Sequence, residues 1–95
     1  MSQIIENRSD IDGVVESVTG SGNDMTVHVR VDAARPVGSV ANLVSEDVGE
    51  VIAIRVRDAA AVPATGSTIS CRVRKVAVDR FFADEGSLQI RRRER

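Results

Sequence analysis

The chain has 95 residues, of which 42% are hydrophobic and 28% are charged, with a formal net charge of -1. This balance excludes a disordered chain, and the length permits one hydrophobic core and therefore one domain. No segment approaches the roughly 18 consecutive apolar residues that a membrane span requires. We therefore expect a soluble, cytoplasmic protein without a membrane partner.

The apolar residues favour strands over helices. Valine dominates them, tryptophan and tyrosine are absent, and Phe81 and Phe82 are the only aromatic residues. β-Branched side chains pack well on a pleated surface, which predicts a mainly β fold. A core of small aliphatic side chains buries less area than an aromatic one, so a homo-oligomer would add stability.

The N-terminal part predicts a hairpin. Residues 25–32 alternate between apolar and polar side chains, which is typical of a half-buried strand. Residues 11–18 provide a preceding strand, and the turn-forming residues 20–24 join the two strands. Residues 1–10 are expected to be an N-terminal extension that either is irregular or contains a short strand.

Residues 39–47 are ambiguous in the sequence. Their apolar residues recur at a spacing near that of a helix, Ser39 is a suitable N-cap, and Gly49 is a suitable helix end. A short helix and a further strand both fit this pattern. The helix or a helical turn is favoured because Asn42 and Ser45 are poor residues for the interior of a strand.

Alternation returns in the second half of the chain. Residues 50–57 form a predicted strand, residues 58–67 a loop that contains proline and glycine, and residues 68–78 the longest strand. Beyond position 73 the alternation slips, which predicts a bulge or a strong bend. The side chains expected to face inward are Ile52, Ile54, Val56, Ile69, Cys71 and Val73.

The C-terminal part predicts a second hairpin. Asp84, Glu85 and Gly86 fit a type I turn with glycine in the left-handed conformation. This turn would join residues 81–83 to residues 88–90. Residues 91–95 are a run of charges with no apolar partner and are expected to be a disordered basic tail.

Five or six short strands with at most one short helix predict a small closed barrel over residues 11–90, because closure leaves no unpaired sheet edge. This outline resembles the OB-fold through its first hairpin, its long bent strand and its final hairpin. The OB-fold carries its helix after the third strand, whereas the helical segment here follows the second. Either an early strand near Ile4 and Ile5 precedes the hairpin, or the chain forms a different six-stranded barrel.

Motifs that carry enzyme chemistry are missing. The sequence contains no glycine-rich phosphate loop, no paired cysteines, no metal-spaced histidines and no nucleophile with a plausible base. We therefore expect a protein without catalytic activity, cofactor or metal. The single histidine, His28, is expected on the exposed face of its strand, and the single cysteine, Cys71, in the core.

The most suggestive residues are basic. Arg55 and Arg57 project from the outer face of one predicted strand, and Arg72 and Arg74 project from the next. If these two strands pair, four guanidinium groups meet, and they repel one another unless an anion such as a phosphate binds there. In the alternative, acids neutralise the cluster across the sheet. The candidate acids are Glu16, Asp32 and Asp58.

The tandem phenylalanines provide an independent argument. Adjacent residues of a strand point to opposite faces, so one ring must face outward. Beside Arg80 it would stack on a base, and the alternatives are that it packs under the loop or fills a dimer interface. We therefore predict a non-enzymatic module that binds single-stranded DNA or RNA. Its expected contact residues are Arg55, Arg57, Arg72, Arg74, Arg80, Phe81 and Phe82.

A second hypothesis follows from the distribution of charge. Residues 1–50 carry nine acids and three arginines, whereas residues 51–95 carry ten bases and five acids. The acidic half of one copy would meet the basic half of another, in a structural or protein-interaction module that self-associates. Folding that interleaves the two halves would cancel this asymmetry.

Overall fold

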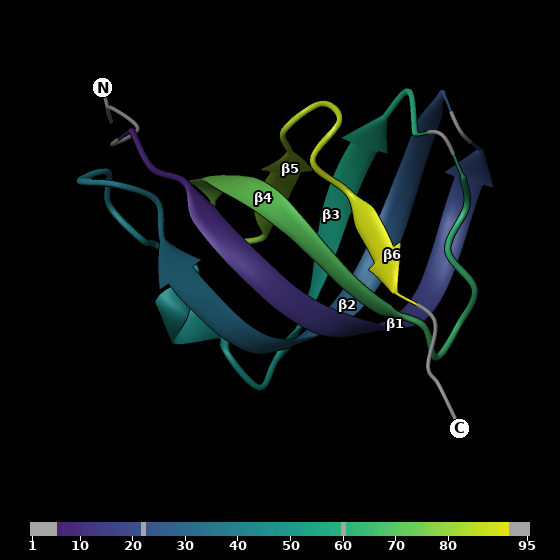
Figure 1. Ribbon diagram of the computed structural model, residues 1–95, viewed down its shortest axis with the longest axis horizontal. Coiled ribbons are helices and arrows are strands. Elements are labelled where there is room, and N and C mark those ends of the chain that lie inside the picture. The colour runs from purple at the N-terminus through teal and green to yellow at the C-terminus, as the bar shows by residue number, and fades with distance from the viewer. Residues whose placement is uncertain (1–5, 22, 60, 92–95) are drawn as a thin grey trace.

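The computed structural model describes residues 6–21, 23–59 and 61–91, and these residues form a closed barrel (Figure 1). Strands β1, β2, β3, β5 and β4 pair in this order, and β1 closes the ring by pairing with β4. All neighbours are antiparallel except β3 and β5, which are parallel. The described elements are β1 (Ser9–Ser21), β2 (Asp24–Pro36), the 3-10 turn η1 (Ser45–Asp47), β3 (Val51–Arg57), β4 (Thr68–Ala77), β5 (Arg80–Ala83) and β6 (Gln89–Arg91).

The predicted fold class is confirmed. The protein is a small, closed, five-stranded mixed barrel with one extra strand, β6, that pairs with β4. This arrangement is consistent with an OB-like architecture. Among the described residues, η1 is the only helical segment, and no helix is long and apolar enough to cross a membrane.

The ends of the barrel differ slightly from the predicted ones. β1 begins at Ser9, inside the predicted N-terminal extension, and Arg91 is the last residue of β6 rather than the first residue of a tail. The early strand predicted near Ile4 and Ile5 and the remainder of the basic tail lie outside the described residues.

β1 belongs to two strand pairs, and the predicted N-terminal hairpin with β2 is confirmed. Residues 9–14 of β1 also pair with β4 on the opposite edge. The ladder between β1 and β2 has an irregularity between Asp12 and Gly13, and such irregularities bend a strand, as the curvature of β1 illustrates (Figure 1). A side chain at Gly13 would collide with β2, because its Cβ would lie 2.4 Å from a methyl carbon of Val29.

The core follows the predicted alternation of side chains. Met25, Val27, Val29 and Val31 of β2 are all buried, with at most 1% of their surface exposed. The predicted inward-facing residues of β3 and β4 are buried as well, and β5 adds Phe81 to the same cluster. Period-two alternation identifies these residues because each strand has one face toward the core and one toward water.

The segment between β2 and β3 contains the helical turn that the favoured prediction allowed, but neither a longer helix nor a strand. Residues 37–44 are irregular apart from a β-bridge between Ala41 and Asn7, and helical structure in this segment is confined to the turn η1, so a helix that starts at Ser39 is wrong. The side chain of Asn42 explains the difference. Its amide group donates to the carbonyl oxygen of Ala34, and its amide oxygen accepts from the hydroxyl of Ser9. These bonds to β1 and β2 compete with helix formation.

The predicted C-terminal hairpin is also wrong, because β5 and β6 do not pair with each other. β5 pairs with residues 73–77 of β4, and β6 pairs with residues 68–70 of the same strand. The actual hairpin is formed by β4 and β5, which are connected through residues 78–79. The local sequence shows where the chain turns but not which strand lies beside it.

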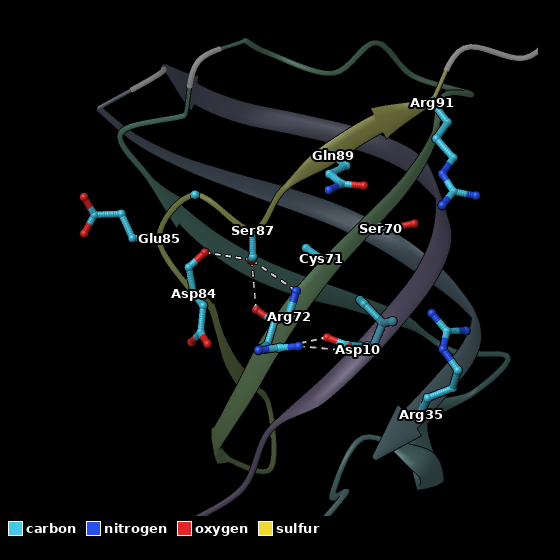
Figure 2. A pocket seen from close by; sticks show the side chains of 12 residues that line it. Asp10, Arg35, Ser70, Cys71, Arg72, Asp84, Glu85, Ser87, Gln89 and Arg91 are labelled. Atoms are coloured by element: carbon cyan, nitrogen blue, oxygen red, sulfur yellow. Dashed lines mark hydrogen bonds and ion pairs between the residues drawn. The ribbon is translucent and has the colours of Figure 1, made fainter. Parts of the chain in front are cut away.

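Residues 84–88 form an excursion between β5 and β6. Gly86 has the predicted left-handed conformation, with φ of 78°. The hydroxyl of Ser87 accepts a hydrogen bond from the N–H of Arg72 at 3.1 Å (Figure 2). The N–H of Asp84 donates to the carbonyl oxygen of Arg72 at 2.7 Å. These two bonds pair the backbone N–H and carbonyl groups of Arg72, which lies between the segments of β4 that pair with β5 and β6.

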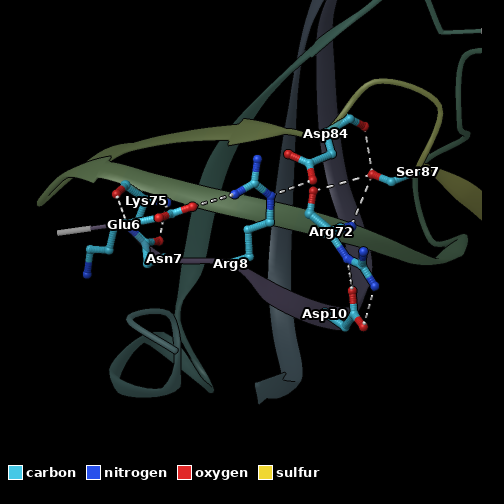
Figure 3. A network of polar contacts seen from close by, with 8 residues as sticks. All are labelled: Glu6, Asn7, Arg8, Asp10, Arg72, Lys75, Asp84 and Ser87. Carbon is cyan, nitrogen blue, oxygen red and sulfur yellow. Dashed lines mark hydrogen bonds and ion pairs between the residues drawn. The ribbon is translucent and has the colours of Figure 1, made fainter. Parts of the chain in front are cut away.

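Lys75 continues the inward face of β4, although its charge suggests an outward position. Its ammonium group lies 2.9 Å from the carboxylate of Asp47 and 5.4 Å from the centre of the Phe81 ring. The side chain of Asn7 bonds to the backbone N–H and carbonyl oxygen of Lys75 (Figure 3). The predicted bulge lies immediately after it, between Lys75 and Ala77.

Candidate nucleic-acid interface

Outward-facing side chains of four neighbouring strands form a row across the barrel. The cross-strand partners are Thr26 and Arg55 on β2 and β3, Arg55 and Phe82 on β3 and β5, and Phe82 and Arg74 on β5 and β4. Residues that are partners across a ladder present their side chains on the same face of the sheet. We call Thr26, Arg55, Phe82 and Arg74 the Phe82 row.

The Phe82 row corrects the predicted arrangement of the arginines. Direct pairing of β3 with β4 is wrong, because β5 lies between them. The parallel contact between β3 and β5 joins residues far apart in the sequence, and no local pattern reveals it. Arg55 and Arg74 therefore flank an aromatic ring instead of facing each other, which reduces their mutual repulsion.

The two phenylalanines have different environments. Phe81 is 2% exposed and lies in the core opposite Ile54, so its predicted role as a contact residue is wrong. Phe82 lies on the outer face and is half-buried. One ring of the pair therefore faces outward, as the alternation of strand residues requires.

Two of the four clustered arginines are neutralised within the protein. Arg55 contacts both carboxylate oxygens of Asp24, at 3.0 and 3.3 Å, and Arg72 contacts both oxygens of Asp10, at 2.9 and 3.3 Å. The hydrogen bonds to the carboxylate of Asp10 raise the pKa of Arg72 above its ordinary value. The neutralising acids are not the predicted ones, since Glu16 pairs with Arg30 instead.

The guanidinium groups of the other arginines of the candidate site are free of ion pairs within the described residues. Arg57, Arg74 and Arg80 are exposed and make no hydrogen bond or ion pair with the described part of the chain. Neutralisation by Asp32 or Asp58 is therefore not observed there. The outer face of β3, β5 and β4 thus presents free cations around the half-buried ring of Phe82.

The acidic and basic halves of the sequence interleave in the fold. Asp10 and Asp24 pair with arginines of the second half, and Lys75 contacts Asp47 at 2.9 Å and Glu46 at 3.6 Å. Part of the charge asymmetry along the sequence is therefore cancelled within the folded chain. Self-association through the remaining charges stays a prediction.

The turn between β4 and β5 borders the Phe82 row. Val78 in this turn is 87% exposed, the highest value among the large apolar side chains of the described chain. Arg80 follows it as the first residue of β5. The rim of the candidate site therefore combines an apolar side chain with a free cation.

A polar groove of about 570 Å³ lies further along the outer face of β4 (Figure 2). β1 and β2 line one side of it, β6 lines the other, and the excursion between β5 and β6 closes one end. Arg35 donates to Asp12 at 2.8 Å, and this hydrogen bond, with a second from Ser70, lowers the pKa of the Asp12 carboxyl. The charged and amide side chains that line the groove are Asp10, Arg35, Arg72, Asp84, Glu85, Gln89 and Arg91.

His28 and Cys71 carry no chemistry that adds to the site. Nδ1 of His28 is buried without a hydrogen-bond partner among the described residues, and the ring lies on β2 opposite Ala53. Burial raises the pKa of the Cys71 thiol to about 12, which makes it unreactive near neutral pH. In the part of the chain that the structure describes, no cluster of histidine, cysteine and carboxylate side chains could hold a metal ion.

Comparisons with known proteins provide no family for this chain. No family model matches it, and no curated protein or solved structure matches it at a significant level. Its function is therefore inferred from the geometry of its own surface.

The Phe82 row can make two kinds of contact. A half-buried aromatic ring provides a flat apolar surface on which a base can stack. Free guanidinium groups on both sides donate paired hydrogen bonds that match phosphate oxygens. A ligand that carries a flat ring close to an anionic group can make both the stacking contact and the guanidinium contacts.

Proposed function

We propose that this protein is a non-enzymatic, OB-like module that binds single-stranded nucleic acid on the outer face of β3, β5 and β4. Phe82 stacks on a base, while Arg74, Arg57 and Arg80 contact phosphates. Arg55 takes part after releasing Asp24, which it contacts through Nη2 alone. Arg72 contributes less because its Nε and Nη2 form a two-pronged contact with Asp10. The observation that carries the proposal is the half-buried Phe82 ring among arginines that have no partner in the described chain.

The architecture supports the same assignment. OB-folds bind oligonucleotides on the face of their second and third strands and through the loops between strands one and two and between strands four and five. The Phe82 row begins on β2 and β3, and the turn that carries Val78 connects β4 to β5. One feature departs from the OB pattern, since residues 58–67 between β3 and β4 contain no helix in their described part.

Binding to a fluorescent oligodeoxythymidylate of about 12 nucleotides tests the proposal, because this length lies within the usual site size of an OB-like module. Fluorescence anisotropy at low salt should detect the complex. Its affinity should fall as salt rises, with a log-log slope of about -0.7 for each phosphate contacted.

Two variants distinguish stacking from simple charge attraction. Phe82→Ala should weaken binding by about 1–3 kcal/mol, the range for one stacked base, with little change in the salt slope. Arg74→Gln should instead reduce the slope by about 0.7. Arg30→Gln is the matched control, because it removes an exposed arginine that pairs with Glu16 away from the Phe82 row. Equal losses for Arg74→Gln and Arg30→Gln, or no binding by the unaltered protein at low salt, would contradict the proposal.

A further inference from the structure

The polar groove lies on the same strand face as the proposed binding surface. Arg74 belongs to the Phe82 row, and Arg72, two residues earlier on the same face of β4, lines the groove. The Arg8–Asp84 ion pair, at 2.9 Å, joins residues on the two sides of β4 between these regions (Figure 3). A polymer that leaves the Phe82 row along β4 passes over this ion pair and then reaches the groove.

The acids of the groove are largely neutralised. Asp10 accepts two hydrogen bonds from Arg72, and Asp84 accepts one from Arg8. Glu85 remains as an exposed carboxylate in the turn at one end. Most of the negative charge inside the groove is thus already paired and opposes an incoming anion only weakly.

Several donors of the groove make no hydrogen bond with the described residues. The guanidinium of Arg91 and the amide of Gln89 make no hydrogen bond with the described residues, and Arg35 uses only Nη1, toward Asp12. Arg91 and Arg35 come from β6 and β2, on opposite sides of β4 and β1 (Figure 2). The groove therefore presents free donors from both of its sides.

The groove offers no surface for a base. Its aliphatic and sulfur-containing lining residues are Ile11 and Cys71, whose side chains point into the core, and it contains no aromatic residue. A ligand held there must be rich in hydrogen-bond acceptors and anionic, which describes the sugar–phosphate backbone of a nucleic acid rather than its bases.

We propose that the groove binds the phosphodiester backbone of the same strand whose base stacks on Phe82, so that the site holds several nucleotides. This inference rests on the proposed function. Four strand residues separate Ser70 in the groove from Arg74, which corresponds to about 13 Å. A stacked strand that advances about 3.4 Å per nucleotide needs about four nucleotides to cover this distance.

Oligonucleotide length tests the inference. Arg91→Gln and Arg35→Gln should each weaken binding of an oligodeoxythymidylate of about 12 nucleotides several-fold and reduce its salt slope by about 0.7. Neither variant should change the binding of a dinucleotide probe, which is too short to reach the groove when it stacks on Phe82. Phe82→Ala should weaken the binding of both probes.

The outcomes separate the two proposals. Arg30→Gln controls for the loss of one positive charge, and thermal unfolding of each variant controls for folding. The groove proposal would be overturned if Arg91→Gln weakened the binding of both probes equally, or by no more than Arg30→Gln does. The proposed stacking on Phe82 would still stand if Phe82→Ala weakens binding. If the unaltered protein binds neither probe at low salt, the proposed function fails and the groove proposal fails with it.

Discussion

Gly13 lies where β1 passes closest to β2, at the first irregularity of their ladder. A Cβ at this position would lie 2.4 Å from a methyl carbon of Val29 and 2.5 Å from the carbonyl oxygen of Arg30. Because one of these atoms is backbone, the strand itself would have to move. Gly13→Ala should therefore lower the free energy of unfolding by about 1–3 kcal/mol, measured by urea denaturation.

Gly38 provides the control for this substitution. It has a positive φ of 56°, and an added Cβ would meet nothing within 4 Å. Asparagine tolerates this conformation, so Gly38→Asn should cost well under 1 kcal/mol. If Gly13→Ala were no more destabilising than Gly38→Asn, the close approach of β1 and β2 would not constrain the barrel.

Asp12 should make the stability of the barrel sensitive to acid. The hydrogen bonds from Arg35 and Ser70 hold the pKa of its carboxyl below the ordinary value of 3.8. Its stabilising contribution is therefore complete above the unfolded pKa and is lost as pH falls through the lower folded pKa. Melting temperatures of the unaltered protein and of Asp12→Asn should converge as the pH falls below about 4. A constant difference between the two proteins down to strong acid would contradict this assignment.

Cys71 should be inert in the folded protein. Burial in the core raises the pKa of its thiol to about 12, so almost no thiolate exists at about pH 8. A thiol reagent such as dithionitrobenzoate should react with it only after denaturant is added. Rapid reaction under native conditions would show that β4 opens readily at this position.

The strands could be predicted from the sequence, but several of the pairings between strands could not. The alternation in β2, β3 and β4 depends only on the residues of each strand, and it identifies their buried faces. The pairing of β3 with β5 joins positions 54 and 81, and it depends on closure of the whole barrel. The same reason explains why Asp10 and Asp24 were missed as partners of the arginines. Their contacts follow from the registers of pairs that the local sequence does not specify.

The alternation of β4 places Lys75 on the buried face, whereas its charge predicts exposure, so the sequence alone gives conflicting predictions for this residue. Asp47, Glu46 and the Phe81 ring make this position tolerable by surrounding the ammonium group. Asp47→Ala removes the carboxylate nearest to a buried cation, so it should lower the free energy of unfolding by about 3 kcal/mol. This is the lower end of the range for breaking a buried ion pair, because Glu46 still contacts Lys75. Lys75→Met removes the charge and retains the volume, so it should cost less.

Urea denaturation of the two variants tests this account of Lys75. A larger loss for Lys75→Met than for Asp47→Ala would mean that the ion pair itself stabilises the fold beyond packing. The pairing of Lys75 with η1 would then be a major source of stability for the end of the barrel.

For the whole molecule, the decisive feature is that the two charged halves of the sequence meet within one chain. The pairs Asp10–Arg72, Asp24–Arg55 and Asp47–Lys75 each join the first half to the second. These pairs reduce the charge that is available for contacts between copies. Light scattering should therefore give the same mass at about 10 mM and about 150 mM salt, although the Debye length falls from about 30 Å to about 8 Å. A mass that is higher at low salt and falls toward that of one chain at high salt would instead support electrostatic self-association, and the arginines around Phe82 would then be candidates for that contact.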